Sequence, residues 1–274
     1  MEKSILITGC SSGIGYDAAH GLQNAGWRVF ASCRKQEDCD RLIAEGLESP
    51  RLDLADEDSI AKALEHILNE TGGTLDALFN NAAFAIPGAV EDLPRDALRE
   101  IFETNLFGTH DLTTRVIPVM RAQGYGRIVN NSSILGLVTY AWRGAYGATK
   151  FALEGLTDTL RLEMRPTDIH VILIEPGPIT SKIRQNSIRH FERHIDWKNS
   201  AVSRLYKKLI HRLYEERDPD FFELPASAVT KILLKALESP HPKPRYYVTK
   251  PTHTFGFLRR ILPTRWLDAI LSRG

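Results

Sequence analysis

Short apolar runs alternate with longer segments of helical periodicity along most of the chain. Residues 169–174, Ile-His-Val-Ile-Leu-Ile, are almost all apolar, as is typical of a strand covered on both faces. Six segments are predicted as strands, namely residues 4–8, 28–32, 76–80, 127–131, 170–175 and 245–249. Five are predicted as helices, namely residues 14–25, 56–70, 95–122, 143–164 and 226–238. This alternation predicts an α/β fold, a doubly wound parallel sheet of the Rossmann type with helices on both faces.

Two stretches depart from the alternation. Residues 185–224 have helical pieces but no strand, and they are rich in Arg, Lys, His and aromatic residues. A long insertion in a compact domain is usually a lid or a binding loop. We therefore expect a single domain over residues 1–274, with a helical substrate lid at about 185–224 and a C-terminal basic-apolar tail at about 251–274.

Length and composition narrow the class of protein. A chain of 274 residues with 43% hydrophobic residues fits one large domain with a buried core. The formal net charge of +1 gives no reason to expect nucleic acid as a partner. Three cysteines suggest no disulfide framework, so we expect a cytoplasmic protein. No apolar run reaches the roughly 18 residues that a transmembrane helix needs.

The tail permits two interpretations. Its arginines, among them Arg259 and Arg265, interleave with apolar residues such as Phe257 and Trp266. Such a pattern suits a helix that lies on a membrane surface. It also suits a helix that packs on its own or a neighbouring subunit.

The first predicted strand runs directly into a glycine-rich turn, Thr8-Gly-Cys-Ser-Ser-Gly-Ile-Gly15, at the start of a helix. Glycines there permit a tight turn and let the backbone approach a pyrophosphate, which the free N–H groups of the helix N-terminus bind. The spacing is Gly-x3-Gly-x-Gly rather than Gly-x-Gly-x2-Gly. The residues predicted to hold a dinucleotide here are Gly9, Ser11, Ser12, Gly13, Ile14 and Gly15.

The end of the second strand commonly distinguishes NAD from NADP. An acidic residue there binds the ribose 2′-OH, whereas an arginine accommodates a 2′-phosphate. This chain has Arg34 and Lys35 there and no carboxylate. We therefore predict NADP, with NADPH preferred over NADH, and we expect Asp53 to accept a hydrogen bond from the adenine amine.

Tyr146 and Lys150 are candidates for proton transfer. On a helix, the spacing i, i+4 places both on one face. A nearby ammonium favours the phenolate and is expected to lower the tyrosine pKa from its usual value of about 10. The same spacing recurs at Tyr246 and Lys250, on a predicted strand where the two lie well apart. Ser133 follows the strand 127–131, at the carboxyl edge where ligands bind in such sheets, so its hydroxyl can hold a substrate oxygen.

Together these motifs resemble the short-chain dehydrogenase/reductase family over nearly the whole length of the chain. A narrower resemblance is to the branch of hydroxysteroid dehydrogenases, retinol dehydrogenases and bacterial NADP-dependent aldehyde reductases. One departure is Ala83, where the family commonly has glycine after Asn-Asn-Ala. The residues that carry the resemblance are the cradle at 8–15, Asn80-Asn81-Ala82, Asn105, Ser133, Tyr146 with Lys150, and Pro176-Gly177.

The resemblance implies a Ser–Tyr–Lys–Asn tetrad. In it Tyr146 exchanges the substrate proton, Lys150 binds the nicotinamide ribose, Ser133 positions the carbonyl, and Asn105 holds a water that relays protons from Lys150. It also implies a homodimer or homotetramer. Further cofactor contacts are expected at Asn80, Ala82, Pro176, Gly177 and Ser181, with Thr180 as the alternative hydroxyl.

These observations predict an NADP(H)-dependent oxidoreductase that interconverts a carbonyl and an alcohol. The lid is rich in Ile, Leu, Phe, Trp and Tyr, so we expect an apolar aldehyde, retinoid or steroid as the substrate. A non-catalytic NADP-binding sensor or scaffold would be expected to carry a broken tetrad, and a sugar-nucleotide epimerase a different glycine spacing. The lid aromatics, including Tyr206, Tyr214, Phe221 and Phe222, suit either a substrate cleft or the packing of the lid itself.

Two further patterns receive plainer interpretations. His190 and His194 have helical i, i+4 spacing and could bind zinc, but no third ligand is evident nearby, so we expect a solvated pair and no metal. Cys33 and Cys39 are expected to be simple thiols.

Overall fold

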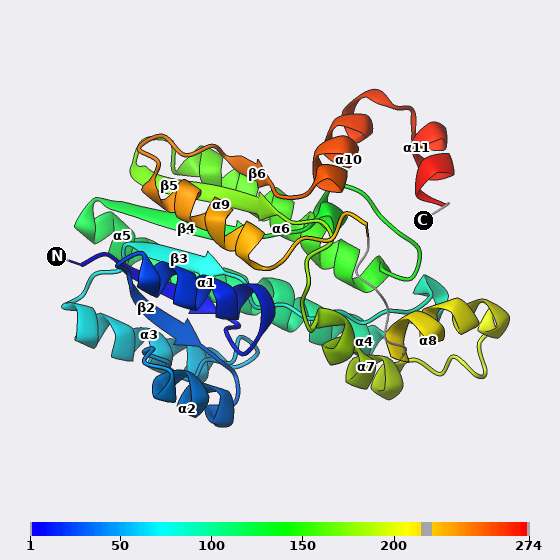
Figure 1. Ribbon diagram of the computed structural model, residues 1–274, viewed down its shortest axis with the longest axis horizontal. Helices are drawn as coiled ribbons and strands as arrows, with labels where there is room; N and C mark the ends of the chain where they lie inside the picture. The colour runs from blue at the N-terminus through cyan, green and yellow to red at the C-terminus, as the bar shows by residue number, and fades with distance from the viewer. Residues whose placement is uncertain (1, 215–220, 273–274) are drawn as a thin grey trace.

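A computed structural model describes residues 2–214 and 221–272, and these form a parallel sheet wound with helices (Figure 1). The strand order is β2-β1-β3-β4-β5-β6, and every neighbouring pair is parallel. The strands are β1 (Ser4–Thr8), β2 (Arg28–Ser32), β3 (Ala77–Asn80), β4 (Tyr125–Asn131), β5 (Asp168–Glu175) and β6 (Arg245–Tyr247). The predicted doubly wound parallel sheet is confirmed.

Helices cover both faces of the sheet. On one face lie α1 (Gly13–Asn24), α2 (Gln36–Ala44) and α9 (Ser227–Glu238), and on the other α3 (Glu57–Thr71), α5 (Thr109–Gln123) and α6 (Gly144–Glu163). Successive side chains of β1 point alternately into the helical layers on the two faces of the sheet, because side chains alternate along a strand. Ile5 and Ile7 pack into the first layer and Leu6 into the second.

The order in which strands are added to the sheet changes side at β1. From β1 it goes first to β2 on one side and then to β3 on the other, so Ile5 pairs with both Val29 and Ala77. In open α/β sheets, ligands bind where such connections diverge, outside the carboxyl ends of the strands. The fold therefore places the glycine-rich turn at the position where such sheets bind ligands.

One predicted helix is interrupted. Residues 95–122 form α4 (Arg95–Phe102), a π-helical turn (Glu103–Gly108) and then α5. Gly108 lies so close to the backbone carbonyl of Leu54 that a Cβ would stand 1.8 Å from its oxygen. This contact comes from a distant part of the chain, which explains why local periodicity suggested a continuous helix. Helix α2 was not predicted at all.

Four helices project beyond the carboxyl edge of the sheet (Figure 1). They are α7 (Ile183–His194), α8 (Tyr206–Tyr214), α10 (Lys250–Ile261) and α11 (Thr264–Leu271). The expected lid at 185–224 thus contains α8 and most of α7, while its residues 215–220 lie outside the described residues, as do the last two residues of the tail.

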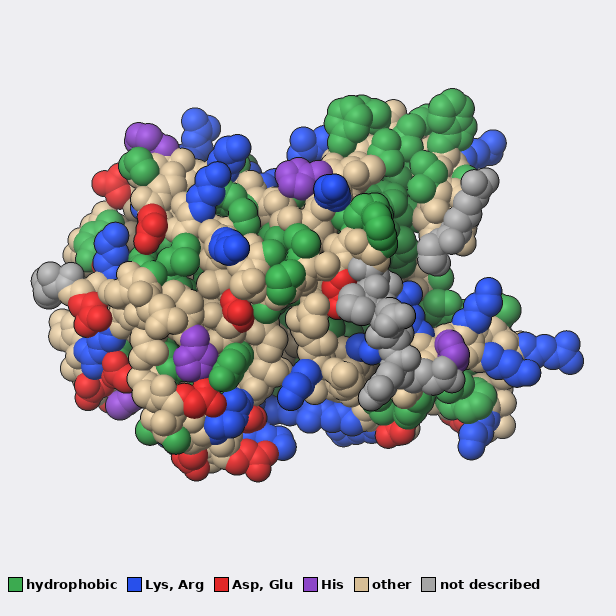
Figure 2. Space-filling model, in the orientation of Figure 1, with side chains coloured by type: hydrophobic (Ala, Val, Ile, Leu, Met, Phe, Trp, Pro, Cys, Tyr) green, Lys and Arg blue, Asp and Glu red, His purple; other side chains and the backbone are tan. Residues whose placement is uncertain are grey.

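The tail packs on the chain itself through one of its faces. Leu271 joins a small apolar cluster with Ile134 and Val138, which follow Ser133. The other face exposes apolar side chains, including Trp266 at 67% (Figure 2). Within the described residues, none of the helices has the length and apolar character that crossing a membrane requires.

Candidate active site

The turn between β1 and α1 leaves no room for side chains at its glycines. Gly9 and Gly13 have φ of 74° and 61°, which non-glycine residues rarely adopt. A Cβ on Gly9 would stand 2.8 Å from Cα of Ala82, and one on Gly15 would stand 2.4 Å from the carbonyl oxygen of Gly9. Three segments of backbone therefore meet closely at this turn.

The N-terminus of α1 fits the phosphates of a dinucleotide. Ser12 precedes the helix without capping it, and the first turn carries no acidic residue. The first N–H groups of a helix have no partner within it, and they attract anions together with the helix dipole. The glycine turn and the helix start predicted from the sequence are present, and dinucleotide binding there stays a prediction.

A network of amides joins the cradle to the neighbouring strand ends. The hydroxyl oxygen of Thr8 accepts the backbone N–H groups of Asn81 and Ala82, each at 3.0 Å. The side-chain amide of Asn81 donates to the carbonyl of Thr8 at 2.9 Å, and that of Asn131 donates to Oδ1 of Asn81 at 2.9 Å. We did not predict these roles for Asn81 and Asn131. The available signal was the pair of Asn-Asn sequences at the ends of β3 and β4, where Asn80 pairs with Asn130.

Asn80 lies deeper than expected for a cofactor contact. Its side chain is buried and donates to Thr113 at 2.9 Å and to Asn130 at 2.8 Å. The amide that lies beside the cradle belongs to its neighbour, Asn81. A cofactor contact at Asn80 stays a prediction.

The residues that follow β2, for which contacts with a cofactor are predicted, lie partly or wholly exposed. Arg34 is exposed, and Lys35 beside it pairs with Glu37 at 2.8 Å. The positive charge of Arg34 also acts on Arg189 of α7, whose pKa is lowered mainly by burial and further by Arg34. Asp53 is partly buried and accepts the N–H of Ala55 at 3.1 Å.

The loop after β5 supports both the cradle and the segment of Ser133. The carbonyl of Pro176 accepts the N–H of Ile134 at 2.7 Å. A Cβ on Gly177 would stand 2.2 Å from the Thr249 hydroxyl, so this glycine allows the start of α10 to approach. Ser181 lies against Gly13, whereas the Thr180 hydroxyl donates to Glu223 at 2.9 Å. Of the two candidate hydroxyls, Ser181 is therefore the one beside the cradle.

The Ser133 hydroxyl lies close enough to Tyr146 to lower the pKa of its phenol. Ser133 lies between β4 and a 3-10 turn, Ile134–Gly136, and its Oγ accepts the N–H of Leu135 at 3.1 Å. Tyr146 lies in the first turn of α6 and belongs to an apolar cluster that includes Ile188 of α7.

Lys150 lies one turn further along α6, as the spacing predicted. Its Nζ donates to the carbonyl of Asn131 at 2.7 Å and stands 5.5 Å from the centre of the Tyr146 ring. The side chain is almost completely buried. One backbone acceptor thus holds the ammonium beside the phenol and joins it to the network of amides.

Burial moves both pKa values toward the neutral forms. It raises the pKa of Tyr146 well above 10, and the hydrogen bond with Ser133 opposes this only in part. Burial also lowers the pKa of Lys150 to about 8, against the attraction of Glu154. The sequence argument expected a lowered tyrosine pKa, and the structure differs because desolvation raises this pKa by more than Ser133 lowers it.

Asn105 lies in the π-helical turn and is almost completely buried. Its amide donates to the carbonyl of Phe84 at 2.9 Å and to the hydroxyl of Thr149 at 3.2 Å, while its Oδ1 accepts the N–H of Phe84 at 3.0 Å. The Thr149 hydroxyl in turn donates to the carbonyl of Tyr146 at 2.8 Å. The four predicted tetrad residues are thus connected in the structure.

A buried charged cluster that the sequence did not reveal lies beneath Lys150. Arg245 of β6 pairs with Glu154, with Glu175 at 2.5 Å and with Asp158 at 2.6 Å. Burial, together with the charge of Glu154, raises the pKa of Glu175 to about 8. Glu154 is the member that also acts on Lys150.

Several aromatics of the expected lid pack the lid itself. Phe191 and Tyr206 are completely buried, and the Tyr206 hydroxyl donates to Asp92 at 2.6 Å. Tyr214 donates to Glu192 at 2.7 Å, and Phe221 is 94% exposed. These side chains therefore carry little information about a ligand.

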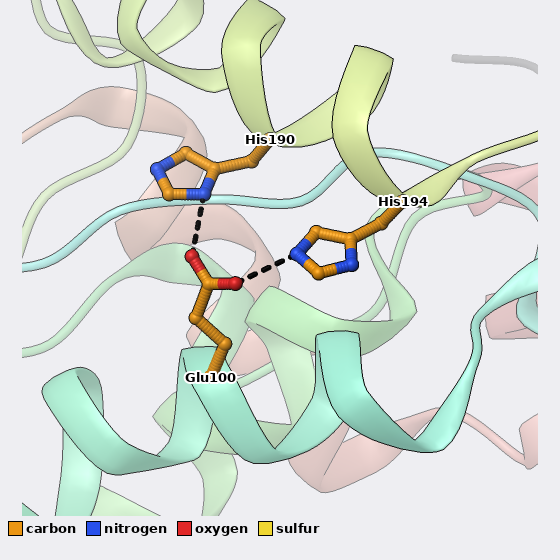
Figure 3. A group of neighbouring side chains, drawn as sticks. All are labelled: Glu100, His190 and His194. Carbon is orange, nitrogen blue, oxygen red and sulfur yellow. Dashed lines mark hydrogen bonds and ion pairs between the residues drawn. The ribbon is translucent and has the colours of Figure 1, made fainter.

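The expectation of a solvated histidine pair is wrong. His190 and His194 are largely buried, and both face the carboxylate of Glu100 on α4 (Figure 3). Glu100 precedes His190 by ninety residues in the chain, so no local pattern could connect them. Cys33 and Cys39 are free, buried thiols, as expected.

Comparison with known sequences places these features in a family. A family model described as "short chain dehydrogenase" matches residues 3–191. The protein "Uncharacterized oxidoreductase YbbO" of Escherichia coli (strain K12) is 38% identical over 272 residues, which cover 99% of this chain and 95% of that protein. The 17-beta-hydroxysteroid dehydrogenase type 1 of Homo sapiens is 31% identical over 261 residues, which cover 90% of this chain and 77% of that protein.

Solved structures agree. A short-chain dehydrogenase from Streptomyces avermitilis is 27% identical with a TM-score of 0.76, covering 98% of this chain and 93% of its own. Another from Burkholderia phymatum, in complex with NAD, is 23% identical with a TM-score of 0.78, covering 98% of this chain and 95% of its own, and shows the same fold.

Proposed function

Because this chain belongs to the short-chain dehydrogenase family and is an oxidoreductase that acts on CH–OH groups, we propose that it uses NADP(H) to interconvert an apolar carbonyl and its alcohol. Ser133, Tyr146 and Lys150 act as its catalytic residues. The observation that carries this proposal is the placement of Tyr146, whose pKa the Ser133 hydroxyl lowers and whose ring centre lies 5.5 Å from the buried ammonium of Lys150.

A bound nicotinamide cofactor supplies the hydride chemistry, and the protein supplies binding, orientation and proton transfer. In the reduction direction, Tyr146 is protonated at neutral pH, because its pKa is raised, and gives its proton to the substrate oxygen. Ser133 donates to the same oxygen and orients it. The charge of Lys150 stabilises the phenolate that remains.

Lys150 regains protons through a polar path. One of its three N–H groups already donates to Asn131, which leaves others for the nicotinamide ribose and for a relay water. Both amide protons of Asn105 are donated within the protein. Asn105 therefore holds such a water through an acceptor oxygen.

The preference for NADPH rests on Arg34. A charge-assisted contact with a 2′-phosphate is worth about 1.5–3 kcal/mol, so Arg34→Ala should weaken NADPH binding roughly 10- to 100-fold and leave NADH binding nearly unchanged. Titration of cofactor fluorescence measures both. Tighter binding of NADH than of NADPH by the wild type would contradict the preference.

An apolar substrate is supported by the surroundings of Tyr146. Its ring shares an apolar cluster with Trp142 and Ile188, at the base of the lid. Each buried methylene contributes about 0.8 kcal/mol, so kcat/KM should rise by up to ~3–4-fold per methylene along a series of straight-chain aldehydes. NADPH oxidation followed at 340 nm tests this series. A flat series, or preference for a phosphorylated or polyhydroxylated substrate, would count against the proposal.

We also propose a cytoplasmic homodimer or homotetramer. Phe107, Leu156 and Leu162 are exposed on the π-helical turn and α6, and these helices carry the dimer surfaces implied by the family resemblance. Light scattering at micromolar concentration tests it, and a monomer would contradict it.

A further inference from the structure

Three side chains of the types that bind metals meet where α7 lies against α4 (Figure 3). Nδ1 of His190 is 2.9 Å from one carboxylate oxygen of Glu100, and Nε2 of His194 is 2.7 Å from the other. All three ligand atoms lie within 4.8 Å of one another. We propose that Glu100, His190 and His194 bind a divalent first-row transition metal, with Zn²⁺ as the natural occupant, and that the ion joins α7 to α4.

The donor set fits this class of ion. Two imidazole nitrogens and one carboxylate oxygen are characteristic zinc ligands, and three protein ligands leave a fourth position for water. With metal–ligand distances of about 2.0–2.2 Å, tetrahedral geometry separates ligand atoms by roughly 3.3 Å. The present separations of 2.9 and 2.7 Å are to two different oxygens of the carboxylate, and the three ligand atoms lie within 4.8 Å of one another. Binding one ion therefore requires side-chain rotations that bring all three to this spacing.

The surroundings hold the imidazoles in place and leave a route for an ion. The side chains of His190 and His194 are only 7% and 9% exposed. The His190 ring stacks on Phe84, with 4.2 Å between ring centres. His194, together with Trp197, lines a cavity of about 580 Å³, so one of the three ligands faces open space.

Two arginines compete with the metal. Nε of Arg189 donates to Nε2 of His190 at 3.1 Å, so the proton of this imidazole is on Nδ1 and points at Glu100. Metal binding at Nδ1 requires the other tautomer, in which Nε2 carries the proton and Arg189 turns away. Arg193 lies 3.4 Å from Glu100, but its side chain is 70% exposed and can turn toward solvent.

The ion would stabilise the architecture rather than take part in the reaction. Phe84, which His190 covers, makes two hydrogen bonds with Asn105 through its backbone. A metal at this site would hold α7 against the segment that positions Asn105. The binding itself does not depend on the proposed catalytic roles and can be measured without substrate or cofactor.

The test is a titration of the metal-free, full-length protein with Co²⁺, followed by visible absorption, and with Zn²⁺, followed by calorimetry. We expect one equivalent to bind. Glu100→Gln, His190→Gln and His194→Gln should each weaken binding by at least ~10-fold, since even the loss of an outer-shell partner costs that much. Circular dichroism checks that each variant is folded, and His194→Gln, near the end of α7, is the mildest of them.

Two further variants sharpen the result. His20→Gln breaks an unrelated His–Glu pair, in which His20 lies 2.9 Å from Glu45, and should leave metal binding unchanged. Arg189→Gln removes the competing donor and should tighten it. The proposal fails if the wild type binds no metal, if folded His194→Gln binds as tightly as His20→Gln, or if Arg189→Gln does not bind more tightly than the wild type.

Discussion

The chain contains the spacing Tyr-x3-Lys twice, at Tyr146 with Lys150 and at Tyr246 with Lys250. The first pair lies on one face of α6, with the ammonium beside the ring. In the second pair, Tyr246 belongs to β6 and Lys250 begins α10 as an exposed residue. The Tyr246 hydroxyl accepts the N–H of Lys243 at 3.0 Å, so its role is to hold the strand in place.

This comparison shows that a four-residue spacing between Tyr and Lys does not by itself identify a catalytic pair. An i, i+4 pair is brought close together only on a helix. On a strand the two side chains share a face but lie about 13 Å apart, because each residue rises about 3.3 Å. The chemistry also needs Ser133, which reaches Tyr146 from another loop. Variants at both pairs can separate catalysis from stability.

The largest effect is expected from removing the Tyr146 hydroxyl. Tyr146→Phe should lower kcat by at least ~100-fold, the usual scale for a lost general acid–base, while cofactor binding and folding survive. The matched control, Tyr246→Phe, should turn over like the wild type. Steady-state kinetics measure kcat for both variants. Equal losses of kcat would contradict the assignment of catalysis to the first pair alone.

The pH profile of reduction tests the role of Lys150. Its pKa of about 8 is below that of an exposed lysine, about 10.4, so the ammonium is present below pH 8 and is lost as the pH rises through this value. The rate should fall over the same range. Lys150→Arg keeps its charge and should abolish this inflection. If the inflection near pH 8 remained in Lys150→Arg, it would have to arise from the titration of a group other than Lys150.

Glu154→Gln should move the same inflection. Its carboxylate raises the pKa of Lys150, so its removal should shift the fall in rate to lower pH. Asp96→Asn, on the exposed face of α4, serves as the control and should leave the profile unchanged. A shift to higher pH in Glu154→Gln would contradict the attraction.

The smallest effect concerns stability. Tyr246→Phe leaves the N–H of Lys243 without its acceptor, and a typical hydrogen bond contributes about 0.5–1.5 kcal/mol. For a domain of this size that lowers Tm by roughly 2–4 °C. Thermal unfolding measures it, with Lys250→Met expected to unfold like the wild type. If Tyr146→Phe destabilised the protein more than Tyr246→Phe, the structural role assigned to Tyr246 would be contradicted.

The sequence by itself determined the sheet and the positions of the main site residues. Strands buried on both faces are largely apolar, and this made the central strands, such as β5 with its run Ile169–Ile174, visible in the residue pattern. The glycine turn and the helical spacing of Tyr146 and Lys150 are equally local, because backbone geometry within a few residues decides them. Their order along the chain was enough to indicate the family.

Only the tertiary structure decided what depends on distant neighbours. The π-helical turn forms where Gly108 meets Leu54 and where Asn105 bonds to Phe84. Glu100 joins two histidines from far along the chain, and Tyr206 is buried in the lid rather than facing a substrate. The direction of the Tyr146 pKa shift also depends on distant residues. Desolvation depends on every group that surrounds a side chain, and no spacing within the sequence records it.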